Sequence, residues 1–283
     1  MRTRLGQNFL VDKNIAKKII KSADISSSDT VIEIGPGKGI LTEELSQKSK
    51  KIIAVEIDKK LSEELIEKYR NQKNIKGIKS CIVSTRSEAS PLMRDASLTR
   101  STIKIINTDF LKYNPPKKLK LKFVANLPYY ISSAVISKIL SLPNWDTAVF
   151  MIQKEVANRL KSQPNSSDYG VLSVACQIFC SVEKMFNVPG TCFHPQPEVT
   201  STVVKLKRLK KPLIKKNEEK NFFRIVKSAF LHRRKTLLNS LFLELKFDKK
   251  ILEEKILQAG ISPLCRAETV SIDGFVKLSK VLS

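Results

Sequence analysis

The chain has few of the residues that build disulfide frameworks or zinc sites. It contains five cysteines and two histidines in 283 residues. No two cysteines have the C-x-x-C spacing, and the histidines, His194 and His232, are far apart in the sequence. Such counts do not suggest a small secreted domain held by disulfides or a zinc-binding module. We therefore expect no metal ion in the functional site.

Long apolar runs are also missing. No segment approaches the roughly 18 consecutive apolar residues that a transmembrane helix needs. The first residues, MRTRLGQNFL, lack the continuous apolar core of a signal peptide. The sequence therefore predicts a cytoplasmic protein with no membrane partner. Since it has no heptad seam and no long exposed apolar strand, we also expect a monomer.

Acidic residues are scarce relative to basic ones. Against 51 Lys and Arg there are 27 Asp and Glu, which leaves a net charge of +24. Residues 205–283 contain 20 basic and 8 acidic side chains, so these last 79 residues hold half of the excess. A surface this basic favours a polyanion, and nucleic acid is the expected partner. The alternative is a solvated surface in a lysine-rich proteome.

The order of the apolar segments indicates an α/β fold. With 42% hydrophobic residues the chain can bury a core, and its length fits one domain of about 200 residues plus a smaller one. Strands that alternate with helices predict a parallel sheet with right-handed crossovers. Strands are expected at 29–34, 51–56, 103–107, 121–125 and 147–152, and helices at 14–23, 40–48, 59–69 and 132–140. Two further β-rich stretches, 170–182 and 199–206, predict an antiparallel hairpin on the same sheet.

Two segments break this pattern. Residues 78–102 are rich in Ser, Thr and Arg without a clear period, which predicts a long surface loop or insertion. A basic linker follows residue 207, and helical patterns then occupy the remaining chain. We therefore expect a first domain over 1–207 and a small α-helical domain over 208–283.

A glycine-rich loop between the first strand and the next helix indicates a nucleotide-like ligand. In EIGPGKG, Gly35, Gly37 and Gly39 let the backbone turn sharply and approach a ligand closely. Glu56 ends the next strand, where a carboxylate can accept hydrogen bonds from both ribose hydroxyls. The spacing G-x-G-x-G differs from the dinucleotide pattern and has no G-K-[ST], so S-adenosylmethionine is the favoured cofactor. A purely structural turn and an NAD site are the alternatives.

Later strand ends supply candidate adenine and substrate contacts. Asp109, in NTDF, could accept the exocyclic amine of the cofactor's adenine, with Phe110 covering the ring; a loop cap is the alternative. In VANLPYY, the Asn126 side-chain oxygen and the Leu127 carbonyl could both accept from one NH₂ group. Pro128 would stiffen the turn, and Tyr129 would offer a stacking face for the target base. The pattern predicts a methyltransferase that acts on an exocyclic amine, by positioning and electrostatic stabilisation.

Several motifs together resemble the KsgA/RsmA family of small-subunit ribosomal RNA adenine dimethyltransferases. The resemblance runs from residue 3 nearly to the C-terminus, and the order and spacing of the motifs make it specific. The motifs are GQNFL (6–10), EIGPGKGILT (33–42), VEID (55–58), NTDF (107–110), ANLPYYISS (125–133), FHPQPEVTSTVV (193–204) and AFLHRRKTLLNSL (229–241).

This resemblance implies a Rossmann-like class I methyltransferase domain followed by a helical RNA- and ribosome-binding domain. The implied reaction dimethylates N6 of two adjacent adenosines near the 3′ end of 16S rRNA in immature 30S subunits, with a role in ribosome biogenesis. The implied cofactor contacts are Asn8, Leu10, Gly35, Gly37, Glu56, Asp109 and Asn126. Asn126 to Tyr129 would hold the target amine, and Phe193 would offer a second aromatic face, unless it is a core residue.

The basic tail suggests the RNA contact. Arg233, Arg234 and Lys235 are expected to form a phosphate-binding cluster at the start of the C-terminal helices, although at least one of three adjacent cations should be solvated or packed. Two features differ from the family pattern: the long 78–102 segment, and Asn107 where Gly is commoner. Asn tolerates a left-handed backbone, so a glycine-like turn is expected at Asn107.

Other functions stay open at the level of sequence. An Erm-type 23S rRNA methyltransferase would share the cofactor loop and Asn-Leu-Pro-Tyr, and a DNA adenine methyltransferase is a weaker alternative. A non-catalytic ribosome-assembly factor would use the basic surface alone, but such a protein would not need Gly35 or Asn126.

Overall fold

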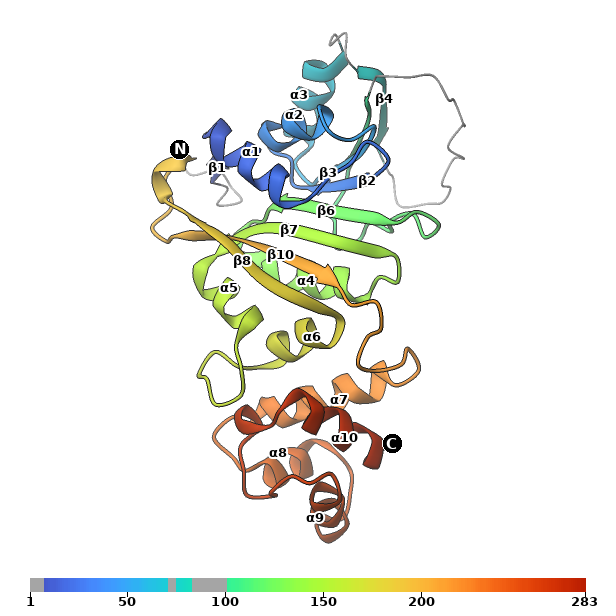
Figure 1. Ribbon diagram of the computed structural model, residues 1–283, viewed down its shortest axis with the longest axis vertical. Coiled ribbons are helices and arrows are strands. Elements are labelled where there is room, and N and C mark those ends of the chain that lie inside the picture. The colour runs from blue at the N-terminus through green and yellow to red at the C-terminus, as the bar shows by residue number, and fades with distance from the viewer. Residues whose placement is uncertain (1–7, 71–74, 83–100) are drawn as a thin grey trace. The chain divides into compact units, whose positions relative to one another are not determined.

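The structure is a computed structural model that describes residues 8–70, 75–82 and 101–283 (Figure 1). The chain forms two compact units. The first comprises Met1–Lys154 and Glu183–Lys207, and the second comprises Glu155–Val182 and Arg208–Ser283. The second unit thus includes an internal segment that we had placed in the first domain.

A mixed sheet is the centre of the first unit, which confirms the predicted α/β class (Figure 1). In the described residues the sheet has the strand order β4-β5-β3-β2-β6-β7-β10-β8. The strands from β4 to β7 are parallel to their neighbours, and β10 pairs with β7 in the antiparallel sense. The bounds are β2 Thr30–Ile34, β3 Lys51–Glu56, β4 Ile75–Ile82, β5 Ser101–Asn107, β6 Leu121–Asn126, β7 Trp145–Gln153, β8 Cys180–Val188 and β10 Ser201–Arg208.

The central strands are apolar because both of their faces are covered. All five residues of β2 are buried, as are five of the six in β3, and such continuous apolar runs are typical of parallel sheets flanked by helices. The short strands β1 (Phe9–Leu10) and β9 (Phe193–His194) pair with each other apart from the main sheet. The helices of this unit are α1 Lys13–Ser22, α2 Ile40–Ser46, α3 Lys59–Arg70, η1 Tyr129–Ile131, α4 Ser132–Ser141 and η2 Gly190–Cys192.

The strand order reverses at β2, and this reversal locates the functional site. The chain leaves β2 to form β3 on one side, and β6 later joins the other side. In open α/β sheets the helices and loops diverge at such a point, and a crevice forms outside the carboxyl ends of the strands. The segments that follow β2, β3 and β6 therefore meet at one edge.

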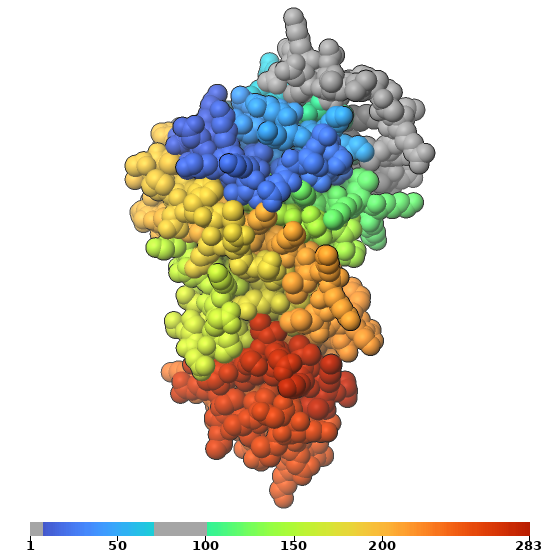
Figure 2. All heavy atoms as spheres, in the orientation of Figure 1, coloured from blue at the N-terminus to red at the C-terminus, as the bar shows by residue number. Residues whose placement is uncertain are grey.

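The second unit is helical and has its own aromatic core. Figure 2 shows its C-terminal helices, in orange and red, packed closely together. The rings of Tyr169, Phe230 and Phe275 pack in series, with centroids 5.8 and 5.7 Å apart, and Tyr169 donates a hydrogen bond to the Val270 carbonyl. The helices are α5 Lys154–Lys161, α6 Val171–Phe179, α7 Glu219–Leu231, α8 Leu237–Glu244, α9 Lys249–Gln258, η3 Ala267–Thr269 and α10 Ile272–Val281. No helix in the described part of the chain is long and apolar enough to cross a membrane.

Two predicted elements were wrong. The segment predicted as β-rich over 170–182 is mostly helix, Val171–Phe179, because a short run that is apolar on nearly all sides fits a buried helix as well as a strand. The loop predicted over 78–102 begins inside strand β4 and ends inside strand β5. These parallel strands pair along most of their length. Residues 83–100 lie outside the described residues.

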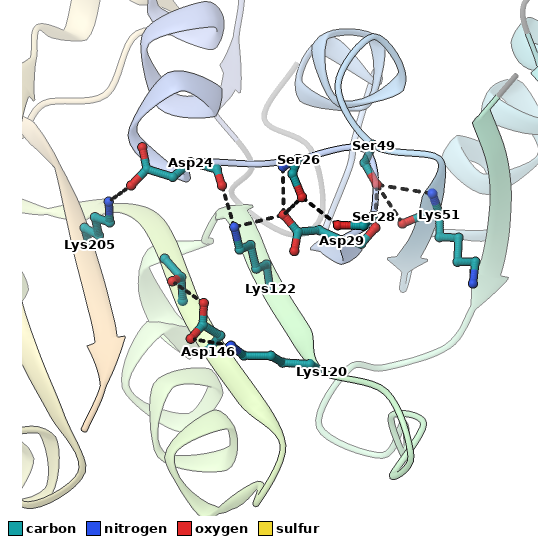
Figure 3. A network of polar contacts seen from close by, with 11 residues as sticks. Asp24, Ser26, Ser28, Asp29, Ser49, Lys51, Lys120, Lys122, Asp146 and Lys205 are labelled. Atoms are coloured by element: carbon teal, nitrogen blue, oxygen red, sulfur yellow. Dashed lines mark hydrogen bonds and ion pairs between the residues drawn. The ribbon is translucent and has the colours of Figure 1, made fainter. Parts of the chain in front are cut away.

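Two lysines form ion pairs at the end of the sheet opposite the functional site (Figure 3). Lys122, at the start of β6, forms an ion pair with Asp29 at 2.9 Å and donates to the Asp24 carbonyl. Lys205 of β10 pairs with the Asp24 carboxylate. The Lys122 and Asp29 side chains are 13% and 23% exposed, so this pair is less screened than an ordinary surface pair, whereas the Asp24 carboxylate is 74% exposed. These contacts join three distant segments at the base of the sheet.

Candidate active site

One cavity lies at the carboxyl edge of the sheet, where the strand order reverses. It is lined by the glycine loop after β2 and by the ends of β3, β5 and β6, with the N-terminal strand β1 beside them. The structure brings together in this cavity the predicted residues Asn8, Leu10, Gly35, Gly37, Glu56, Asp109, Asn126, Leu127, Pro128 and Tyr129. Phe193 does not line it.

The glycine loop has the backbone that its sequence predicts. Gly35, Gly37 and Gly39 have φ values of +64°, +56° and +80°, in the left-handed region that side chains disfavour. Steric limits add to this, since a Cβ at Gly37 would lie 3.1 Å from the Phe9 ring. A Cβ at Gly39 would lie 2.7 Å from the side chain of Leu65. By contrast, a Cβ at Gly35 would meet no atom within 4 Å, so open space lies beside the loop.

Glu56 is buried at the floor of the cavity and is only partly satisfied. Its carboxylate is 1% exposed; Oε2 accepts from the Gly37 amide at 3.0 Å, and Oε1 accepts from the Asp58 amide at 2.9 Å. Burial raises the pKa of Glu56, although these amide hydrogen bonds oppose the rise. A carboxylate has about four acceptor sites, and the Ile57 amide also lowers the pKa of Glu56 by hydrogen bonding, so at least one site stays available for a ribose hydroxyl.

Glu33 is a buried carboxyl that the sequence reasoning missed. It is the fourth of the five residues of β2, is 1% exposed and lines the cavity. Thr42 donates to its Oε2 at 2.6 Å, whereas Oε1 is buried without a hydrogen-bond partner in the described residues. Burial is the main cause that raises the pKa of Glu33 to about 8, and the nearby Glu56 adds to it. The available signal was a single charged residue within an apolar strand.

The Asp109 loop is held from behind by a lysine. Asp109 Oδ1 accepts from the Leu111 amide at 2.8 Å, as a loop cap does, and its side chain also faces the cavity. Lys138 of α4 donates to the carbonyls of Phe110, Leu111 and Tyr113 at 2.6–2.8 Å. Burial lowers the pKa of Lys138, and Asp109 partly offsets that effect. The loop between β5 and β6 is therefore fixed in place beside the cavity.

Asn126 has an amide orientation that suits an acceptor. Its Nδ2 donates to the Asn8 carbonyl at 3.1 Å, so its Oδ1 is directed away from that contact. The next residue, Leu127, is tied to β7 through its amide and the Met151 carbonyl at 3.0 Å. The side-chain oxygen of Asn126 therefore has a defined direction at the cavity wall.

The two tyrosines after Pro128 differ in exposure. The Tyr129 hydroxyl lies 3.1 Å from the Ser201 hydroxyl, and this contact ties its half-buried ring to β10. Tyr130 also lines the cavity and is 65% exposed, which the sequence reasoning missed. A consecutive second aromatic residue was the available signal.

Phe193 and Arg233, two of the predicted site residues, make contacts within the protein itself. Phe193 is 5% exposed in the hydrophobic core and pairs with Leu10 in the β1–β9 ladder, which corresponds to the core alternative. Arg233 donates to the carbonyls of Ser167 and Tyr169 and forms an ion pair with Glu268 at 3.3 Å.

The basic cluster lies in a turn rather than at the start of a helix. Arg233, Arg234 and Lys235 follow the end of α7 and precede α8, and all three are exposed. Since Arg233 is engaged within its own unit, Arg234 and Lys235 are the better candidates for phosphate contacts.

The expected glycine-like turn at Asn107 is absent. Among the described residues, the non-glycine residues with positive φ are Asp24 and Asn165. Asn107 is instead the last residue of β5, paired opposite Glu56 of β3. Asn at this position therefore needs another physical explanation.

The cavity fits an adenosyl cofactor better than a dinucleotide. A buried carboxylate with remaining acceptor capacity suits a ribose, and the open space beside Gly35 suits the close approach of a ligand to the loop. The fold and this site define a class I S-adenosylmethionine-dependent methyltransferase. The family model for ribosomal RNA adenine dimethylases matches residues 1–86 and 81–283. The chain belongs to the ribosomal RNA adenine dimethylase family, and it is an enzyme that uses S-adenosylmethionine.

Known proteins similar to the chain cover nearly all of it. A protein of Clostridium botulinum named ribosomal RNA small subunit methyltransferase A is 41% identical over 280 residues, covering 97% of this chain and 91% of that protein. The structure of a dimethyladenosine transferase from Plasmodium falciparum is 28% identical with a TM-score of 0.74, covering 95% of each chain. The structure of the 23S rRNA methyltransferase ErmE is 26% identical with a TM-score of 0.67, covering 97% of this chain and 99% of that one.

Proposed function

We propose that the chain dimethylates N6 of two adjacent adenosines near the 3′ end of 16S rRNA within immature 30S subunits. The observation that supports this most directly is the oriented amide of Asn126 at the wall of the cofactor cavity. The name of the Clostridium botulinum relative supports the small subunit as the target. A cytoplasmic monomer that acts without a metal ion is part of this proposal.

In this proposal the protein positions the amine rather than deprotonating it. When bound, S-adenosylmethionine supplies a methyl group on a positively charged sulfur. Asn126 Oδ1 and the Leu127 carbonyl accept the two hydrogens of the adenine amine, which turns the nitrogen lone pair out of conjugation with the ring. The bound cofactor would supply the methyl group as the methyl–sulfur bond breaks and a nitrogen–carbon bond forms, and the proton lost from the amine would pass to solvent. After the first transfer only one hydrogen is left, so one acceptor loses its partner during the second.

The other predicted residues have supporting roles. Tyr129, whose ring is held by the Ser201 contact, offers a face to the target base, and Pro128 stiffens the approach to η1. Glu56 accepts the ribose hydroxyls and Asp109 accepts the adenine amine of the cofactor, both from the cavity wall. For Phe193 a stacking role requires its buried ring to turn outward, so we assign it a core role.

The test is the mass mapping of methylated adenosines. Immature 30S particles, 50S particles and adenine-containing DNA are each incubated with the protein and S-adenosylmethionine. We expect dimethyladenosine at two adjacent positions of 16S rRNA alone. Methylation of 23S rRNA would instead favour the Erm-type function. An absence of methylation on every substrate, with intact 30S binding, would favour a non-catalytic assembly factor.

Asn126→Ala supplies the matched test of mechanism. The variant should bind S-adenosylhomocysteine within a few-fold of wild type but lose roughly a hundredfold in methyl transfer, because one preorganised partner of the amine is gone. Glu56→Gln should have the opposite effect and chiefly weaken cofactor binding. Near-normal turnover by folded Asn126→Ala would reject the role of the amide.

A further inference from the structure

Asn107 makes a set of contacts that the proposed mechanism does not use. Its side-chain nitrogen donates to the Glu56 carbonyl at 3.0 Å, the Ile57 carbonyl at 3.3 Å and the Ser62 hydroxyl at 3.2 Å. Since an amide NH₂ has two hydrogens, at least one of them is shared between two acceptors. One side chain from the end of β5 thus contacts three groups at or beyond the end of β3.

These acceptors belong to the turn that presents the Glu56 carboxylate. The Ser62 hydroxyl donates to the Asp58 carbonyl at 3.0 Å, and the Asp58 amide donates to Glu56 Oε1 at 2.9 Å. The Asp58 side chain also caps the first turn of α3, through the amides of residues 60 and 61. Asn107 is therefore linked both to the backbone of Glu56 and, through Ser62 and Asp58, to its carboxylate.

The sheet alone does not hold this turn. Parallel pairing between β3 and β5 ends at the Glu56–Asn107 pair, and the Thr108 amide adds one more bond to the Glu56 carbonyl. Ile57 is the first residue past β3, lines the cavity and is 51% exposed. The Asn107 amide extends strand-like hydrogen bonding by one residue, to the Ile57 carbonyl, without lining the cavity itself.

We propose that Asn107 is a positioning residue for the cofactor: it fixes the turn after β3 so that the Glu56 carboxylate faces the ribose hydroxyls. This inference rests on the ribose role proposed for Glu56. It also explains why Asn suits this position. The backbone there is not left-handed, and the side-chain amide of Asn107 makes the contacts that matter.

A double-mutant cycle tests the inference by calorimetry with S-adenosylhomocysteine. Asn107→Ala should weaken binding about tenfold, and Glu56→Gln should weaken it more. In the double variant the Asn107 change should add less than about twofold, because it acts through the carboxylate that is already altered. At saturating S-adenosylmethionine, Asn107→Ala should keep near-normal kcat while KM for the cofactor rises.

A matched control separates positioning from general stability. Asn144 is another half-buried asparagine whose side-chain nitrogen donates to two carbonyls, those of Pro116 and Leu119, but it does not line the cavity. Asn144→Ala should lower stability and leave the S-adenosylhomocysteine affinity unchanged. If Asn107→Ala misfolds, Asn107→Ser serves in its place, since its shorter hydroxyl cannot reach the same acceptors.

The outcomes distinguish the two levels of the proposal. If Glu56→Gln binds S-adenosylhomocysteine as wild type does, the ribose role itself is wrong. If Glu56→Gln binds weakly while Asn107→Ala binds normally, the ribose role stands and the positioning role is overturned. Fully additive losses in the double variant would also overturn it, because Asn107 would then act independently of Glu56.

Discussion

Replacing Glu33 by Gln should stabilise the cofactor-free protein, and more so as the pH rises. Burial and the neighbouring Glu56 raise the pKa of Glu33 from 4.5 to about 8, and one of its oxygens has no partner in the described residues. Gln has the same shape as protonated Glu and can still accept the Thr42 hydrogen bond. The variant therefore removes an ionisation that the fold disfavours.

The direction follows from proton binding. Between pH 4.5 and about 8 the unfolded chain has released the Glu33 proton while the folded protein still binds it. The folded state then binds more protons than the unfolded state, so the free energy of unfolding falls as the pH rises. Below pH 4.5 both states are protonated and there is no effect. Above about pH 8 the loss is complete.

The magnitude is large enough to measure. At about 1.4 kcal/mol for each tenfold step, the rise from 4.5 to about 8 corresponds to about 5 kcal/mol of unfolding free energy when the loss is complete. At pH 7 the loss is about 3 kcal/mol. Glu33→Gln should therefore match wild type about one pH unit below 4.5, and exceed its stability by about 1 kcal/mol at pH 5 and about 3 kcal/mol at pH 7.

Urea unfolding followed by tryptophan fluorescence provides the assay. Trp145 is the single tryptophan, is 2% exposed and lies in β7 of the first unit, so its signal reports the unit that contains Glu33. Comparison with wild type at each pH cancels the titrating groups that do not interact with Glu33. As a control, Glu63→Gln on the exposed face of α3 should change the unfolding free energy by less than about 0.5 kcal/mol. A difference between wild type and Glu33→Gln that stays constant from pH 5 to 8.5 would refute the reasoning.

Three further predictions concern the loop, the basic turn and the long connection. Gly39→Ala should lower the urea midpoint and weaken cofactor binding in calorimetry, because a Cβ there is strained and would lie 2.7 Å from the Leu65 side chain of α3. Changing Arg234 and Lys235 together to Gln should reduce the salt dependence of the 30S binding constant by about two units and leave cofactor affinity unchanged. An unchanged salt dependence in this double variant would place the RNA elsewhere. Arg233→Gln should instead chiefly lower the stability of the second unit. Replacing residues 83–100 by a Gly/Ser linker of about fourteen residues, long enough to return along a parallel strand, should leave cofactor affinity intact. Loss of that affinity would show that the segment supports the site.

Sequence patterns located the site because its geometry follows from chain topology. Carboxyl ends of parallel strands share one edge, so Glu56, Asp109 and Asn126 could be expected near the glycine loop before any coordinates were known, and the structure places them there. The residue types after each strand then indicated the chemistry.

Features that depend on distant partners could not be predicted in this way. The ring of Tyr129 is fixed by Ser201, 72 residues later, and the Phe193 ring is buried by the pairing of β9 with β1. The helix Val171–Phe179 has only two polar residues, Ser173 and Gln177, which are too few to distinguish a helical period from a strand. Glu33 looked like an ordinary strand residue until its burial was known.

The contact between Asn126 and Asn8 has a consequence for synthesis of the protein. Strand β1, beside the cavity, is the first described element to leave the ribosome, yet its partner β9 begins only at Phe193. In a nascent chain the glycine loop is therefore complete long before β1, which lines the same cavity, can pair with β9. Since such distant pairings form late, we expect this enzyme to hold its cofactor only after Phe193 has been translated.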